Sequence, residues 1–134
     1  MELFAWNDEL SVGCLEVDQD HKKLVGILNS LIAAIKEEHG REVIGKILND
    51  LLSYTSWHFR HEERLMQTYR FSGFMAHKKE HAELIAQAVT LQKQFDEEGK
   101  DLSDDVLEFL KKWLTHHILE VDMVMGRFLH EKIK

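Results

Sequence analysis

Histidines and acidic residues recur in this 134-residue chain at spacings typical of metal-binding helices. HFRHEE at residues 58–63 contains an HxxxE pair, and HKKEH at residues 77–81 contains an HxxxH pair. Residues four positions apart lie on one face of an α-helix, so both side chains of each pair can reach one ion. Further histidines occur at position 21 and in LTHHILEVD at residues 114–122. The sequence therefore indicates a metal centre built from imidazoles and carboxylates.

The elements that must position these residues are predicted to be helices. The chain has no proline, and apolar residues recur with a period of about 3.6 in four segments. We expect Asp18 or Asp20 to cap the first helix and Ser103 to open the last one. The predicted helices run approximately from Asp18 to Glu38, Arg41 to Thr68, Phe74 to Glu97 and Ser103 to Lys132.

Short connections between these segments favour antiparallel neighbours. The predicted fold class is all-α, an up-down-up-down antiparallel four-helix bundle. Residues 18–132 are expected to form the bundle and residues 1–17 an irregular N-terminal arm, within a single domain of residues 1–134.

Nine histidines are present, and helical geometry separates them into two sets. Five lie on apolar stripes, and Glu62 shares the stripe of its neighbour at position 58. These five are His21, His58, His77, His81 and His117. The other four, which we expect at the surface, are His39, His61, His116 and His130.

Alternating chain direction brings the five inward histidines and Glu62 to the same end of the bundle. A buried carboxylate among neutral imidazoles would cost several kcal/mol without a compensating charge. Five imidazoles exceed the four ligands of a structural zinc ion, and no cysteine joins them. The number and type of ligands suit two six-coordinate ions that share carboxylates, and iron suits this mixed ligation.

Four motifs in this order resemble those of the hemerythrin family, and of its single-domain bacteriohemerythrins in particular. The motifs are WNDELSVGCLEVDQDHKKL (residues 6–24), HFRHEE (58–63), HKKEH (77–81) and WLTHHILEVD (113–122). The resemblance covers nearly the whole chain and implies a cofactor of two iron ions (Fe2+/Fe3+) with an oxo or hydroxo bridge.

The resemblance also assigns the ligands. It implies that one iron is held by three histidines and the other by two, while two carboxylates bridge both ions. His61 and Glu63 are expected to point away from the centre. The three-histidine set is His77, His81 and His117, the two-histidine set is His21 and His58, and the bridges are Glu62 and Asp122.

The assignment of Asp122 is not what helical spacing alone selects. Asp122 follows His117 by five positions, which is about 140° around an ideal α-helix. Glu120 lies equally far from the centre of the apolar stripe on the other side, so geometry leaves the choice open and the resemblance favours Asp122. A local π-type widening of the last helix would relieve the mismatch.

Counting the implied ligands and the oxygen bridge against two six-coordinate irons leaves one coordination position open, on the two-histidine iron. The resemblance implies that dioxygen binds there. The expected oxygen pocket consists of Leu114 and Ile118, with Trp113 and Phe59 beside them. The favoured function is reversible dioxygen binding for storage, delivery or sensing. A di-iron enzyme acting on peroxide or nitric oxide, which would need a proton donor near the open position, and an iron or redox regulatory module remain alternatives.

Charge and composition limit the expected partners. A net charge of −7 disfavours nucleic acid, whose phosphates bind basic surfaces. No apolar run approaches the ~20 residues of a membrane span, and the single Cys14 suits a reducing compartment. We therefore expect a cytoplasmic protein without membrane insertion, monomeric, with dioxygen as ligand and an oxygen-consuming or signalling protein as a possible partner.

Overall fold

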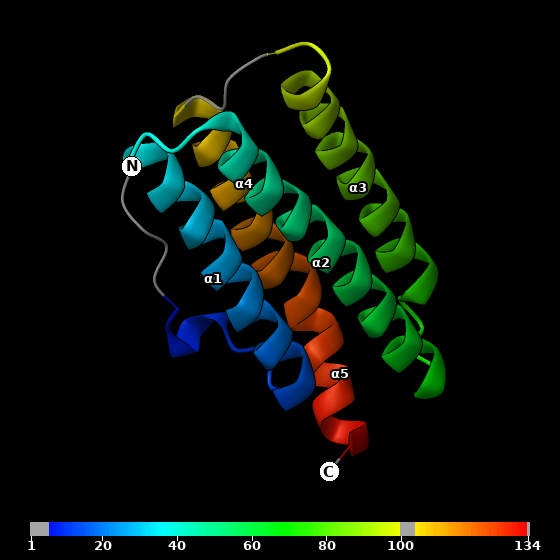
Figure 1. The fold of residues 1–134 in the computed structure, drawn as a ribbon. Helices are drawn as coiled ribbons and strands as arrows, with labels where there is room; N and C mark the ends of the chain where they lie inside the picture. Colours follow the sequence, from blue (N-terminus) through cyan, green and yellow to red (C-terminus); the bar gives the residue numbers. More distant parts are fainter. Residues whose placement is uncertain (1–5, 100–103, 134) are drawn as a thin grey trace.

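The computed structural model describes residues 6–99 and 104–133, and these form a four-helix bundle without any strand (Figure 1). Successive helices run in opposite directions, so the predicted all-α antiparallel bundle is confirmed. The final three elements follow one another without a break and together form the fourth helix. The elements are η1 (Asp8–Leu10), α1 (Leu15–Lys36), α2 (Arg41–Thr68), α3 (Phe74–Asp96), α4 (Asp104–His116), η2 (His117–Asp122) and α5 (Met123–Ile133).

The first helix begins earlier than predicted. α1 starts at Leu15, with Cys14 at its N-cap position, so neither Asp18 nor Asp20 is a helix cap. The carboxylate of Asp18 instead accepts hydrogen bonds from the Ser11 hydroxyl (2.6 Å) and the Val12 backbone amide (2.8 Å). These bonds hold the N-terminal arm, which includes the short 3-10 turn η1, against the bundle. Ser103, expected to open the last helix, lies outside the described residues.

The apolar core extends well beyond the histidine-rich end of the bundle. Leu28, Leu51 and Leu110 are each no more than 3% exposed, and Ile32 and Leu129 are fully buried. Burial of a leucine or isoleucine side chain contributes about 1.5–3 kcal/mol. The bundle therefore has a source of stability that is independent of any metal.

The last helix widens where its sequence departs from α-helical spacing. Residues His117–Asp122 form the π-helix η2, which confirms the predicted π-type widening. Hydrogen bonds from i to i+5 replace the usual i to i+4 bonds in such a turn. Both His117 and Asp122 are consequently buried, whereas Glu120 is exposed.

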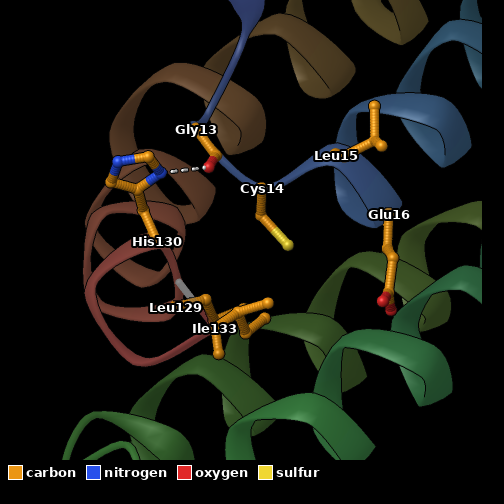
Figure 2. Close-up of a pocket in the computed structure, with 7 residues that line it drawn as sticks. All are labelled: Gly13, Cys14, Leu15, Glu16, Leu129, His130 and Ile133. Carbon is orange, nitrogen blue, oxygen red and sulfur yellow. Dashed lines mark hydrogen bonds between the residues drawn. The ribbon is translucent and has the colours of Figure 1, made fainter.

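The N-terminal arm ends in a hollow beside the C-terminal turn of α5 (Figure 2). Gly13, with a positive φ of 83°, accepts a hydrogen bond through its carbonyl from Nδ1 of His130 (2.9 Å). Cys14 points into this hollow toward Leu129 and Ile133 and is 4% exposed. Burial raises the pKa of the Cys14 thiol, which keeps it protonated and unreactive.

None of the described helices combines the length and apolar character needed to cross a membrane.

The close approach of the arm to α5 predicts a strict requirement for glycine at position 126. A Cβ added there would overlap the carbonyl oxygen and side chain of Val12. Gly126→Ala should therefore lower the melting temperature in thermal unfolding followed by circular dichroism. Gly26→Ala is the matched control, because a Cβ at position 26 would have no atom within 4 Å apart from its chain neighbours and the backbone of its own helix. Alanine should stabilise that exposed helical position by up to about 1 kcal/mol, and equal melting temperatures for the two variants would contradict the packing described here.

Candidate metal centre

Seven side chains from all four helices of the bundle converge in its interior. Each is 4% exposed or less, so the cluster is shielded from solvent. α1 contributes one residue, α2 and α3 contribute two each, and η2 contributes two. The cluster consists of His21, His58, Glu62, His77, His81, His117 and Asp122.

These residues form two groups of potential ligands that share two carboxylates. Within each group, one ligand atom from every residue lies within 4.8 Å of the others. Glu62 and Asp122 belong to both groups. The first group adds His77, His81 and His117, and the second adds His21 and His58.

Glu62 turns one oxygen toward each group. Its Oε1 lies 3.0 Å from Nε2 of His81 and 3.6 Å from Nε2 of His77. Its Oε2 lies 3.2 Å from Nε2 of His58 and 3.5 Å from Nε2 of His21. Each group of histidines therefore faces its own oxygen of Glu62.

Asp122 likewise turns one carboxylate oxygen toward each group. Its Oδ1 lies 2.9 Å from Nε2 of His77 and 3.0 Å from Nε2 of His117. Its Oδ2 lies 2.9 Å from Nε2 of His21. The widened turn of η2 allows Asp122 to join His117 in the cluster, although the two are five positions apart.

Three of the five histidines donate a hydrogen bond to a carboxylate on the preceding helix of the bundle, through the ring nitrogen that faces away from the cluster. Nδ1 of His58 donates to Asp20 (2.8 Å), Nδ1 of His81 to Glu63 (2.8 Å) and Nδ1 of His117 to Glu80 (3.2 Å). A neutral imidazole that donates through Nδ1 has a bare lone pair on Nε2. The outer carboxylates therefore direct these lone pairs into the cluster.

The inward lone pairs face one another and require a cation between them. Nε2 of His81 lies 3.1 Å from Nε2 of His117, and both Nδ1 atoms are already engaged. Several inward atoms, including all four oxygens of Glu62 and Asp122, are buried without a hydrogen-bond partner. Histidine nitrogens lie close to these oxygens, but a neutral ring that donates through Nδ1 presents a lone pair there rather than a hydrogen. Leaving buried polar atoms unsatisfied costs about 1–3 kcal/mol each. Metal ions would satisfy these atoms, so the donor set fits a metal centre.

Protons compete with metal ions for the ligand atoms of the cluster. Burial by itself would lower the pKa of His58, but the charge of Glu62 and the hydrogen bond to Asp20 raise it to about 10. For His77, the carboxylates of Asp122 and Glu62 likewise outweigh burial and raise the pKa to about 9. Burial would raise the pKa of Glu62, yet the surrounding histidines hold it well below its usual range. The cluster therefore attracts positive charge strongly.

A small cavity of about 10 Å³ borders the two-histidine side of the cluster. Of the expected oxygen-pocket residues, Phe59, Trp113 and Leu114 line this cavity, while Ile118 is fully buried but is not among the lining residues. Sequence analysis missed Leu24 and Leu84, which also line it. Their apolar periodicity marked them only as core positions.

Sequence analysis also missed the outer carboxylates. Asp20 was predicted to cap a helix, and Glu63 was expected only to point away from the centre. Each of the three acids contacts a histidine on a different helix, so spacing within one helix contains no signal for the pairing.

Comparisons with known proteins show which family the chain resembles. The sequence pattern of the family described as "Hemerythrin HHE cation binding domain" matches residues 15–129. A bacteriohemerythrin of Methylococcus capsulatus is 33% identical over 127 residues, which cover 94% of this chain and 96% of that protein. A bacteriohemerythrin of Stenotrophomonas maltophilia is 32% identical over 118 residues, or 88% of this chain and 76% of that protein.

Solved structures show the same fold. A crystal structure of wild-type hemerythrin has a TM-score of 0.87 and 33% sequence identity, and the alignment covers 96% of this chain and 99% of that one. The sequence pattern, the relatives and the structural likeness each extend over most of the chain. The protein therefore belongs to the hemerythrin family.

Proposed function

We propose that this protein binds dioxygen reversibly at a non-haem pair of iron ions, for oxygen storage, delivery or sensing. The observation that carries the proposal is the pair of buried ligand groups in which Glu62 and Asp122 each turn one oxygen to either side. The proteins named bacteriohemerythrin and hemerythrin among the relatives support the same function.

The proposed ligands are the seven residues of the cluster. His77, His81 and His117 would hold one iron, His21 and His58 the other, and Glu62 and Asp122 would bridge them, together with an oxo or hydroxo bridge. The iron pair, when bound, supplies the two electrons that reversible dioxygen binding requires. The protein would supply the oriented histidine lone pairs and a small, largely apolar cavity, and the bound ions would compensate the charge of the buried carboxylates.

The cavity supports a carrier rather than an enzyme. Phe59, Trp113 and Leu114 place apolar side chains around the cavity on the two-histidine side, and its volume of about 10 Å³ is about that needed for a single water molecule. Among the described residues that line it, the ionisable ones are His21, His58, His117 and Asp122, all of them proposed ligands. A reaction that cleaves bound oxygen would benefit from an additional proton donor there.

We further infer that residues 1–134 act as one monomeric domain in the cytoplasm and exchange dioxygen with an oxygen-consuming or signalling protein. The single cysteine of the sequence, which is buried, suits a reducing compartment.

The proposal is tested by mixing the anaerobic diferrous protein with oxygenated buffer in a stopped-flow spectrophotometer. We expect about two irons per chain, uptake of one dioxygen per iron pair, and recovery of the starting spectrum after oxygen is removed. Zinc in place of iron after iron-replete expression, or oxidation without recovery, would contradict the proposal.

The role of Leu114 in the dry cavity gives a second prediction. Leu114→Ala should open the cavity to water and accelerate oxidation of the oxygenated protein to the diferric form, measured as the autoxidation rate at fixed temperature and pH. Leu110→Ala is the control, because Leu110 is similarly buried one helical turn away but does not line the cavity. Both variants should lose roughly 2–5 kcal/mol of stability. Equal autoxidation rates would exclude Leu114 from the oxygen site.

The raised histidine pKa values predict how the metal-free protein responds to pH. Their folded values, about 10 for His58 and about 9 for His77, exceed the unfolded value of about 6.5. The stability they contribute is thus complete below pH 6.5 and is lost as the pH rises through the folded values. Chelated protein should melt at a lower temperature at pH 9.5 than at pH 6.5, and iron-loaded protein should change less. A chelated protein that melts equally at both pH values would contradict this electrostatic account.

A further inference from the structure

Asp20 on α1 is the centre of a hydrogen-bonded group outside the metal cluster. It is 6% exposed, and three donors from α2 surround its carboxylate. Oδ2 accepts from Nδ1 of His58 (2.8 Å) and from Nδ1 of His61 (2.6 Å), and Oδ1 accepts from the hydroxyl of Tyr54 (3.3 Å). One oxygen is therefore shared between a proposed iron ligand and a histidine that is not a ligand.

This outer group is satisfied by its own hydrogen bonds, unlike the inner cluster. Burial would raise the pKa of Asp20, but the hydrogen bonds from His58 and His61 hold it below its usual value, so the carboxylate is ionised. His61 is partly buried, its ring packs on that of Trp57 with the centroids 5.2 Å apart, and its Nε2 faces Glu16 at 3.6 Å. These contacts fix the side chain of His61 beside Asp20.

We propose that Asp20 is a positioning residue that sets the reduction potential of the iron held by His21 and His58, and that His61 weakens its effect by competing for the same oxygen. The inference rests on the function proposed above, because that iron is the one with the open position. It concerns how strongly the protein favours the ferric state at the oxygen-binding side of the centre.

The physical basis is the polarisation of the His58 ring. A carboxylate that accepts the Nδ1 proton of an imidazole increases electron density on Nε2 and makes it a stronger metal ligand. A more electron-rich imidazole donor stabilises ferric iron more than ferrous iron and lowers the reduction potential. Because His61 donates to the same Oδ2, removing that donor should strengthen the bond from His58.

The geometry gives Asp20 a different position from the other outer carboxylates. Glu63 and Glu80 hold His81 and His117, which belong to the three-histidine group. On the two-histidine side, His58 has the carboxylate partner, whereas Nδ1 of His21 is buried without a hydrogen-bond partner in the described structure. Asp20 is thus the outer carboxylate that can influence, through His58, the iron proposed to have the open coordination position.

The test compares midpoint potentials of three variants by spectroelectrochemical titration of the iron-loaded protein. Asp20→Asn replaces an anionic acceptor by a neutral one and should raise the potential. His61→Phe keeps a ring against Trp57 but removes the competing donor, and should lower the potential. Asp18→Asn is the matched control, since it removes an equal charge from the same helix but contacts the arm residues Ser11 and Val12. Its potential should be unchanged.

Shifts of opposite sign for Asp20→Asn and His61→Phe are the expected result, because a merely structural disturbance would not reverse its sign between the two. Equal potentials in all variants, or shifts in the same direction, would overturn the proposal. Should Asp20→Asn fail to fold, the direction of the His61→Phe shift decides: an unchanged or raised potential would equally overturn it.

Two further measurements separate this inference from the proposed function. Iron content shows whether the wild-type chain binds the ion pair at all, and a chain that binds no iron would refute the proposed function. Nitrogen-15 NMR of the metal-free protein at a pH above the folded pKa of His58, about 10, reports the tautomer of its neutral ring without any iron. We expect the proton on Nδ1 in the wild type and in Asp18→Asn, and loss of that preference in Asp20→Asn. An unchanged tautomer in Asp20→Asn would overturn the role of Asp20 independently of iron.

Discussion

The structure depends on one constraint, the compensation of two fully buried carboxylates surrounded by five buried imidazoles. Hydrogen bonds within the cluster leave all four oxygens of Glu62 and Asp122 without partners. Apolar packing elsewhere in the bundle stabilises the fold but contributes no counter-charge. Protons on the histidines or metal ions between them are therefore needed to compensate the two carboxylates.

The outer carboxylates show how the bundle prepares the site before an ion arrives. Asp20 on α1 holds a histidine of α2, Glu63 on α2 holds one of α3, and Glu80 on α3 holds one of η2. Each bond joins consecutive helices, so packing of the bundle and orientation of the ligands are coupled. A fold that has formed correctly has already directed three lone pairs inward, which reduces the ordering that metal binding would otherwise require.

Much of this could be predicted from sequence, because spacing within a helix determines which side chains share a face. The HxxxE and HxxxH pairs indicated the inward residues. Spacing left Asp122 and Glu120 open, and the family resemblance favoured Asp122. Its five-residue interval from His117 then indicated the widened turn that the structure contains. Spacing did not reveal contacts between helices, so Asp20 was predicted to be a cap rather than a partner of His58. The start of α1 was predicted too late because the arm uses Asp18 as its anchor.

The most direct test of the account is anomalous diffraction at the iron absorption edge from crystals of iron-replete protein. We predict two anomalous peaks, one beside His77, His81 and His117 and the other beside His21 and His58, with Glu62 and Asp122 contacting both. A single peak, or a peak coordinated by Asp20, His58 and His61 in place of the inner cluster, would contradict it.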